Sequence, residues 1–513
     1  MSTVFKIFCN WNVDLVPSYG LKLPNMLRFR TYIILFCLVL PGHMVFAKSD
    51  SGFGSRIRSV LNSRANKKTL YSIHFCDVAD GREVFSFNSQ RPQKPASNMK
   101  LITTAAAVDL LGPDFVYETV YGLMDGNLVI VAAGDPLLGD PKIAQQTGGT
   151  IFDIFDKLAA ELRNRGFSTI PGNIIIDNSI FDDERFHPSW PINQANRWFA
   201  AQVSGLNFND NCVDILFSPG PGGAPARFQL TPDTTYLKIT NKCRTVSSGK
   251  TAVGATRQHH TNKVTLIGKC KTAITKPIYV AVDQPSVYHG YVLAEYLLKQ
   301  GIRINAGGKL LIEQVRSPDN SLPDDLQVLL THRTAIDTVL DQCNQRSLNL
   351  AAECLLKTAG AYYQAAKQPG GKINNGSWKT GQAAVAAFLK ELGIDADQYK
   401  IDDGSGLSHN NRISAKCFTT VLRYMSDHKA AKMYRDSLAS SDRGTLKKKR
   451  RFSGKKYKGR VLAKTGYINS VNTLSGYCKT KSGRHLAFSI LTNKPAASNS
   501  TIDKIVKEII DAN

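Results

Sequence analysis

The chain has 513 residues and a formal net charge of +24. This length is too great for one ordinary hydrophobic core, so the sequence predicts two or three domains. A hydrophobic content of 42% and an aromatic content of 9% are typical of a globular protein, and they exclude bulk disorder, a collagen and a coiled coil.

The N-terminus has the organisation of a secretory signal peptide. Two arginines precede a short apolar run at residues 31–40, and Val45-Phe46-Ala47 offers the small residues that a signal peptidase requires. We expect residues 1–47 to be removed by cleavage after Ala47, with Met26 as a candidate for the true start. The alternative is an uncleaved N-terminal anchor.

The positive charge has to be interpreted for an exported protein. Such a charge favours polyanionic partners, and the run from Lys447 to Arg451 is typical of a nucleic-acid arm. Export argues against nucleic acid, so we expect none to bind and interpret the run as a solvated basic loop. Peripheral contact with an anionic membrane surface or a carboxylate-rich cell wall fits an exported chain better.

The first part of the mature chain, residues 48–118, is predicted to hold two strands and a helix. Tyr71 to Val78 and Val84 to Asn88 have strand composition and are joined by a hairpin signal. Ser97 to Leu111 has helical composition and is stopped by Gly112-Pro113. A strand pair therefore leads into a helix whose composition indicates burial.

Residues 119–325 differ from both flanks. Short β-rich runs alternate there with Gly, Pro and Asn turns, at 128–132, 173–177, 236–240, 263–267 and 278–282. We interpret this stretch as one or two mostly β domains inserted into the rest of the chain.

Residues 326–513 turn helical and then return to strands. Helices are predicted at 334–343, 348–361, 380–392, 415–427 and 502–510, and strands at 460–465, 473–479 and 485–492. The economical fold is α+β. An antiparallel sheet combines the first two strands with the last three, helices cover both faces, and the β-rich region is an insertion.

Three short motifs that carry chemistry occur in one order. They are Ser97-Asn98-Met99-Lys100, Ser347-Leu348-Asn349 and Lys464-Thr465-Gly466. As a set they resemble the active-site motifs of penicillin-recognising serine enzymes. Ser97 and Lys100 share one face of a helix start, where a lysine amine of lowered pKa can activate a serine hydroxyl.

The other two motifs supply the remaining roles. Ser347 can relay a proton between Lys100 and a leaving amine, and Asn349 can hold Lys100 or bind the substrate backbone. Lys464 and Thr465 can bind the terminal carboxylate of D-alanine. Gly466 leaves room for a substrate strand beside the backbone, and a backbone N–H just beyond it can complete an oxyanion hole with that of Ser97.

Each motif alone has little specificity, because all three recur in this chain. Ser453-Gly454-Lys455-Lys456 also matches SxxK, three further SxN triplets occur, and Lys379-Thr380-Gly381 is a second KTG. Context favours the first set, since Ser453 lies in a basic loop and Lys379 opens a predicted helix.

Longer segments resemble one family. These are Pro95 to Leu101, Asp403-Gly404-Ser405-Gly406-Leu407-Ser408, Ala463 to Gly466, Ala132 to Pro136 and Val203 to Asn207. They resemble the D-alanyl-D-alanine carboxypeptidase/endopeptidase family, the low-molecular-mass penicillin-binding proteins with a large insertion between SxxK and SxN. The resemblance implies a β-lactamase/transpeptidase-like domain split by the insertion, activity on peptidoglycan peptides and acylation by β-lactam antibiotics.

Two details of the resemblance are left open. Such families usually carry Thr or Ser directly after KTG, where this chain has Tyr467, and this puts the carboxylate-binding hydroxyl and the substrate preference in doubt. Asp403 and Ser405 are candidates to line the cleft, although a glycine-rich turn explains them equally well.

The sequence thus predicts an exported serine D-Ala-D-Ala carboxypeptidase, with D,D-endopeptidase action also open, in the periplasm or cell envelope. The alternatives are a catalytically weak peptidoglycan-binding protein and, with less support, a serine β-lactamase. No CxxC or Cys/His spacing indicates zinc, so neither a metal nor an organic cofactor is expected. Cys243 and Cys270 are candidate disulfide partners, with the pairing left open.

Overall fold

The computed structural model describes residues 52–305 and 307–512. The predicted signal peptide, its cleavage after Ala47 and the start at Met26 lie outside the described residues. Within the described part of the chain, every helix is too short or too polar to cross a membrane.

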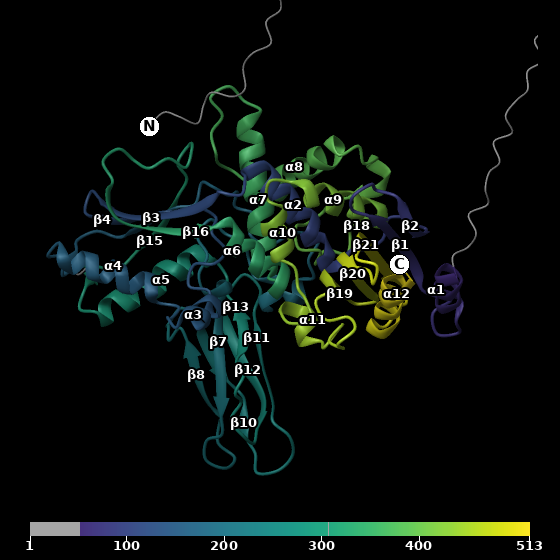
Figure 1. Cartoon of the computed structure of the whole chain (residues 1–513). Coiled ribbons are helices and arrows are strands. Elements are labelled where there is room, and N and C mark those ends of the chain that lie inside the picture. The colour runs from purple at the N-terminus through teal and green to yellow at the C-terminus, as the bar shows by residue number, and fades with distance from the viewer. Residues whose placement is uncertain (1–51, 306, 513) are drawn as a thin grey trace, which may run out of the picture. The chain divides into compact units, whose positions relative to one another are not determined.

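The central sheet joins the two ends of the described chain (Figure 1). Its five antiparallel strands run in the order β19-β20-β21-β1-β2. The bounds are Leu70–Asp77 for β1, Glu83–Phe87 for β2, Val461–Ile468 for β19, Val471–Lys479 for β20 and His485–Asn493 for β21. The predicted combination of the first two strands with the last three is confirmed.

Helices cover both faces of this sheet, because its strands alternate apolar residues between them. Ile73 and Phe75 of β1 pack with helices α1 (Gly52–Asn62) and α12 (Asn499–Ala512). Cys76 of β1 packs into a second core, on the other face of the sheet. That core holds α2 (Met99–Leu111), α7 (Asn349–Ala366), α8 (Trp378–Glu391) and α9 (Ala415–Asp427).

Shorter elements complete this half of the molecule. They are α6 (Ile336–Asp341), the π-helical turn η5 (Gln342–Arg346), β17 (Tyr399–Lys400), β18 (Arg412–Ile413), α10 (Ala431–Asp436) and α11 (Gly444–Lys448). α2 lies in the middle of the core, and every side chain from Met99 to Val108 is buried. The predicted buried helix after the first hairpin is therefore present.

The region from β3 to β16, here called the inserted region, leaves the core after α2 and returns before α6. β3 (Val116–Met124) and β16 (Gln327–Ala335) pair with each other along most of their length. They belong to a second five-stranded sheet, in the order β15-β6-β4-β3-β16. Its other strands are β4 (Asn127–Val131), β6 (Ile174–Asp177) and β15 (Ile312–Val315).

Helices in the inserted region were missed by the sequence analysis, which expected mostly strands there. α4 (Asp153–Asn164) and α5 (Pro285–Lys299) pack into the core beneath the second sheet, and α3 (Pro141–Thr147) is a shorter addition. α4 buries Ile154, Phe155 and Leu158, which recur at helical spacing.

The rest of the inserted region is β-structure that shares the same core. One sheet is β13-β7-β8, and another joins β9, β10 and β11 to β12. The bounds are Thr169–Ile170 (β5), Cys212–Ser218 (β7), Arg227–Thr231 (β8), Lys238–Asn241 (β9), Arg244–Thr245 (β10), Ala252–Arg257 (β11), Lys263–Cys270 (β12), Ile278–Ala281 (β13) and Arg303–Ile304 (β14). All eight cysteines of the described chain are buried free thiols, so the considered Cys243–Cys270 disulfide is not formed.

Candidate active site

Ser97 and Lys100 lie at the start of α2, where a single 3-10 turn (Ala96–Asn98) leads into the helix. The turn is sharp, because Ala96 adopts a left-handed φ of 47°. It brings Ser97 Oγ to 3.3 Å from the Nζ of Lys100, which is fully buried. The two side chains therefore form a hydroxyl–amine pair on one face of the helix.

The surroundings of Lys100 favour its neutral form. Burial lowers the pKa of Lys100 to about 8, although the nearby Cys343, Glu353 and Asp403 oppose the shift. Two acceptors hold the amine in place, Asn349 Oδ1 at 2.6 Å and the carbonyl oxygen of Ser405 at 2.8 Å. An amine with these properties can take a proton from a neighbouring hydroxyl near neutral pH.

The second motif brings the start of α7 to the same place. Ser347 follows η5 with a left-handed φ of 66°, which turns the chain into α7. Asn349 is the first residue of that helix. Its Oδ1 accepts from Lys100, and its Nδ2 donates to the carbonyl of Phe199 in the inserted region at 2.6 Å. Asn349 thus positions Lys100, one of the two roles that the sequence left open.

The third motif lies on β19, at the edge of the central sheet. Lys464 is fully buried and donates to Ser347 Oγ at 2.8 Å and to the carbonyl of Thr465 at 2.9 Å. Burial, with the charge of Lys100 adding to it, holds the pKa of Lys464 well below its usual range. Thr465 bonds through Oγ1 to Thr445 of α11 at 2.9 Å.

Gly466 has a structural role besides the one expected for a substrate strand. A Cβ at this position would lie 2.2 Å from Thr473 Oγ1, 2.9 Å from the carbonyl oxygen of Pro95 and 3.1 Å from the backbone N of Asn98. The Thr473 hydroxyl itself donates to the Pro95 carbonyl at 2.9 Å. Glycine is therefore required for β19 to lie against the turn that presents Ser97.

A buried carboxylate that the sequence analysis missed fixes the loop behind Lys100. Glu353 of α7 accepts from the backbone N–H of Gly404 and Ser405 at 2.9 and 2.8 Å, and from the indole of Trp378 at 2.9 Å. Asp403 accepts from the backbone N–H of Gly406 at 2.7 Å. Glu353 carried one sequence signal, a charged residue in an otherwise apolar helical run one turn after Asn349.

This loop packs against the Ser97 turn as well as against Lys100. Gly406 has a φ of +80°, and a Cβ there would lie only 1.8 Å from the carbonyl oxygen of Ala96. Ser405 acts through its carbonyl oxygen, because its side chain is buried and bonds to the backbone of Leu407 at 3.3 Å. The segment is thus a glycine-rich turn that supports the catalytic pair from behind. Asp403 and Ser405 are fully buried and do not line the cleft, so the turn interpretation holds and the cleft-lining one is wrong.

The first two motifs border a cleft of about 420 Å³, whereas Lys464, Thr465 and Gly466 do not line it and only the segment directly after them, residues 467–469, does. Ser97, Ser347 and Asn349 line it, and Tyr467 lies at its rim with 69% of its surface exposed. Residues of the inserted region form another part of the lining, among them Pro191, Gln194, Trp198 and Phe199. None of these was singled out from the sequence, because their place depends on how the inserted region packs.

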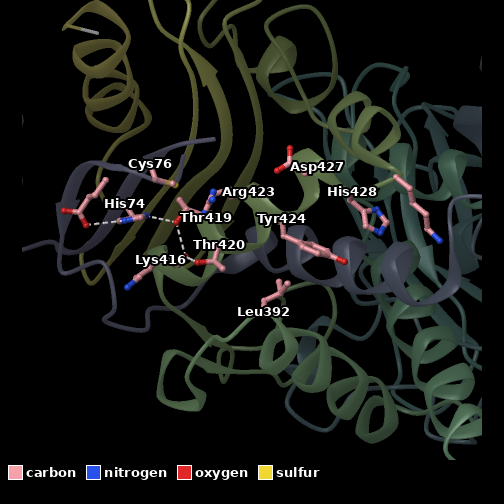
Figure 2. Close-up of a pocket in the computed structure, with 13 residues that line it drawn as sticks. His74, Cys76, Leu392, Lys416, Thr419, Thr420, Arg423, Tyr424, Asp427 and His428 are labelled. Carbon is pink, nitrogen blue, oxygen red and sulfur yellow. Dashed lines mark hydrogen bonds and ion pairs between the residues drawn. The ribbon is translucent and has the colours of Figure 1, made fainter. Parts of the chain in front are cut away.

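A wider pocket of about 840 Å³ lies elsewhere, between the β1–β2 hairpin and α9 (Figure 2). Its lining contains no residue of the three motifs. His74 of β1 contacts Thr419 Oγ1 of α9 at 2.6 Å and Glu83 at 3.4 Å, so its polar atoms are engaged within the fold. Chemistry rather than size therefore identifies the smaller cleft as the candidate active site.

Comparison with known proteins agrees with this choice. Residues 56–511 match the model of the D-Ala-D-Ala carboxypeptidase 3 (S13) family. The chain belongs to this family. The resemblance found in the sequence is thereby confirmed, and the chain is a serine-type D-Ala-D-Ala carboxypeptidase by family.

Two curated relatives of this S13 chain carry the same activity in their names. A D-alanyl-D-alanine carboxypeptidase of Actinomadura sp. (strain R39) is 28% identical over 464 residues, which cover 85% of this chain and 80% of the relative. The D-alanyl-D-alanine carboxypeptidase DacB of Haemophilus influenzae is 26% identical over 433 residues, covering 80% and 83%.

Solved structures agree on the fold. Penicillin binding protein 4 of Haemophilus influenzae superposes on the S13 chain with a TM-score of 0.72 at 19% identity, covering 89% of this chain and 99% of that one. The same protein complexed with a β-lactam gives a TM-score of 0.66 at 19% identity, with 88% and 97% covered. The predicted fold class, a transpeptidase-like α+β domain, is confirmed.

Partly buried ion pairs hold the inserted region against this site. Arg346, next to Ser347, pairs with both Asp140 and Asp210 of the inserted region. Lys357 of α7 is buried and donates to Asp182 at 2.6 Å.

Within residues 52–305 and 307–512, no group of three His, Cys, Asp or Glu side chains is arranged to hold a metal ion.

Proposed function

We propose that this S13 enzyme is exported and removes the terminal D-alanine of peptidoglycan stem peptides through an acyl-enzyme on Ser97. The observation that carries the proposal is the 3.3 Å separation of Ser97 Oγ from the Nζ of Lys100, a buried amine whose pKa is lowered to about 8. A serine hydroxyl beside such an amine is an activated nucleophile.

In the acylation step, Lys100 accepts the proton of Ser97 while Oγ attacks the carbonyl carbon of the D-Ala-D-Ala bond. The negative charge that develops on the carbonyl oxygen is stabilised by the backbone N–H groups of Ser97 and Tyr467. The second donor is a backbone group, so a tyrosine can supply it as well as the threonine or serine of related motifs.

The leaving amine receives its proton through Ser347. Lys464 donates to Ser347 Oγ at 2.8 Å, which leaves the hydroxyl hydrogen of Ser347 free to point toward the amine. Ser347 is then reprotonated from Lys100. Water, activated in turn by Lys100, hydrolyses the ester and releases Ser97.

Lys464 and Thr465 bind the carboxylate of the departing D-alanine. Burial and the charge of Lys100 hold the pKa of Lys464 low. A substrate carboxylate supplies the missing counter-charge and raises that pKa again. The site therefore gains a full cation when it binds a peptide with a free C-terminus.

The same cleft admits two further reactions. D,D-endopeptidase action on cross-links breaks the same type of bond, and β-lactam antibiotics acylate the same serine. A related structure complexed with a β-lactam supports this second reaction. The predicted signal peptide supports an address in the periplasm or cell envelope. The proposed chemistry uses neither a metal nor an organic cofactor.

A fluorescent penicillin tests the proposal. The mature protein and its Ser97→Ala variant are incubated with the probe, and the labelled peptide is mapped by mass spectrometry. A lasting adduct on Ser97, together with D-alanine release from a D-Ala-D-Ala peptide that the variant no longer catalyses, supports the proposal. An unlabelled, inactive but folded protein contradicts it and favours a wall-binding role, whereas rapid penicillin turnover favours a β-lactamase.

A further inference from the structure

The segment between α11 and the central sheet carries an unusual density of positive charge. Residues 447–460, here called the basic segment, contain nine Lys or Arg residues and no Asp or Glu. The sequence alone favoured a solvated loop, an interpretation that leaves these cations without a role. Their positions in the structure argue otherwise.

The basic segment is held against the rest of the molecule. Arg451 is buried and donates to Asp503 of α12 at 2.8 and 2.5 Å. Phe452 packs into the core beneath the central sheet. Lys456 and Tyr457 both donate to Asp511, at 2.7 and 2.8 Å. These contacts fix the backbone of the segment, so the remaining cations are gathered on one part of the surface.

Five cations of the basic segment have no such role. Lys447, Lys448, Lys449, Arg450 and Lys455 are all exposed, and none pairs with a carboxylate of the described residues. Like charges that lie close together repel one another and destabilise the fold. These five cations therefore do not serve the stability of the fold, and another role has to account for them.

The basic segment adjoins the active site. Thr445, at the start of α11, bonds to Thr465 of the third motif at 2.9 Å. The charge of Lys449 is one of those that lower the pKa of Lys464. Figure 1 shows α11 beside β19, the strand at one edge of the central sheet. A ligand bound along the basic segment therefore lies next to the cleft.

We propose that the basic segment is a docking surface for the anionic cell-wall polymer that carries the substrate peptides. This rests on the proposed function, because it takes the polymer to be the one that the cleft acts upon. The polymer's charge comes from the repeated carboxylates of its peptides, which a cluster of exposed cations on a fixed backbone can attract. Docking raises the concentration of peptide ends at the cleft.

Two other polyanions fit the surface less well. The segment exposes no apolar side chain that could enter a bilayer, since Phe452 is buried and Tyr457 is bound to Asp511. For the same reason it offers no aromatic platform on which nucleic-acid bases could stack. A polymer that is recognised by charge alone needs neither.

Matched charge variants test the docking surface. The test variant is K447Q/K448Q/R450Q/K455Q, which keeps Lys449 because of its effect on Lys464. The control variant is R244Q/K250Q/K269Q/K271Q, which removes three lysines and one arginine that are also exposed, in the β10–β12 part of the inserted region. Both carry Ser97→Ala for binding experiments, so that the polymer is not consumed.

Binding is measured by co-sedimentation with purified peptidoglycan sacculi, before and after removal of attached phosphate polymers, and with vesicles containing phosphatidylglycerol. The test variant should bind sacculi on the order of tenfold more weakly than the Ser97→Ala parent at low salt. The difference should vanish at high salt, because exposed charges are then screened. The control variant should bind like the parent.

The two sacculus preparations identify the source of the charge. Retained binding after phosphate removal assigns it to the carboxylates of the peptide-bearing polymer, and lost binding overturns the proposal in favour of the attached phosphate polymer. Equal binding by the test variant and the parent overturns the proposal, as does an equal loss in the control variant. A loss seen only on vesicles overturns it in favour of a membrane surface.

The proposed function is tested separately with the same charge changes on the active enzyme. Hydrolysis of a small soluble D-Ala-D-Ala peptide should be the same in the test variant and the wild type, because such a peptide does not need docking. Absent hydrolysis in the wild type contradicts the proposed function and leaves the binding measurement to decide on the docking surface.

Discussion

Glu353 accepts a hydrogen bond of 2.8 Å from the backbone N–H of Ser405, and the carbonyl oxygen of Ser405 in turn accepts the amine of Lys100 at 2.8 Å. A fully buried carboxylate thus fixes the proposed base without touching it. Burial, with the charge of Asp403 adding to it, raises the pKa of Glu353. Its hydrogen bonds to backbone N–H groups stabilise the charged form in return.

Glu353→Gln should slow acylation and leave the fold intact. The amide nitrogen cannot accept, so at least one donor among Gly404, Ser405 and Trp378 loses its partner, at a cost of about 1–3 kcal/mol. We expect the second-order rate constant for fluorescent penicillin to fall roughly 10- to 100-fold, because the lost hydrogen bond shifts the Ser405 carbonyl that holds Lys100. Circular dichroism checks the fold.

The matched control for this change is Glu391→Gln, at the exposed end of α8. It removes the same charge from the surface and should leave the acylation rate unchanged. Acylation of Glu353→Gln at the rate of the control would show that the loop holds Lys100 without the carboxylate.

The acylation rate should rise with pH and level off near pH 8. Only the neutral amine of Lys100 accepts a proton, and its pKa is lowered to about 8. Below that value the neutral fraction falls about tenfold per pH unit, and above it the fraction is saturated. The carboxylate of penicillin stays ionised throughout, so rate constants from pH 6 to 10 report on the protein. A rate that is flat from pH 6 to 8 would exclude Lys100 as the base.

Arg346→Ala should destabilise the protein strongly. Arg346 pairs with Asp140 and Asp210 beside Ser347, and its removal leaves the buried carboxylate of Asp140 and the half-buried carboxylate of Asp210 without their cation. Breaking such a pair costs about 3–5 kcal/mol. Chemical denaturation measures the loss.

Arg333→Ala is the control, since its pair with Glu118 is exposed and is worth less than about 1 kcal/mol. Equal losses in the two variants would contradict this prediction.

Gly466→Ala should impair acylation because β19 can no longer lie against the Ser97 turn. The added methyl group would meet backbone atoms of Pro95 and Asn98, which cannot move aside without displacing Ser97. Overpacking of this kind costs about 1–3 kcal/mol. The measurement is penicillin labelling at a fixed time.

The matched control is Gly454→Ala. The added atom there meets nothing within 4 Å, so this variant should label like the wild type. Full labelling of Gly466→Ala would mean that the turn tolerates the shift.

Much of the catalytic half could be predicted because its signals are local. The helix expected at Ala415–Asp427 is present with the same bounds, and the three last strands differ from expectation by only a few residues. Alternating apolar residues and glycine-bounded turns define such elements without reference to the rest of the chain. The order of the three motifs then selected the residues that the structure brings together.

The parts that could not be predicted depend on contacts between distant segments. Glu353 and Ser405 are far apart in sequence, and nothing local indicates that one accepts from the other. The same holds for the Phe199 carbonyl that binds Asn349. The helix at Asp153–Asn164 is a different case, because its apolar spacing was present in the sequence but was outweighed by the β-rich runs around it.

The pairing of β1 with β21 has a consequence for how the protein comes into being. Leu70 lies opposite Asn493, so the strand that precedes the nucleophile pairs with a strand that is synthesised much later. Contacts so distant in sequence form late and slowly. A chain that has not yet reached β19 cannot assemble Ser97, Lys100 and Lys464 into one site. A product that is terminated before β19 would be inert toward both peptide and antibiotic, and activity begins only after the last strands of the central sheet have been synthesised.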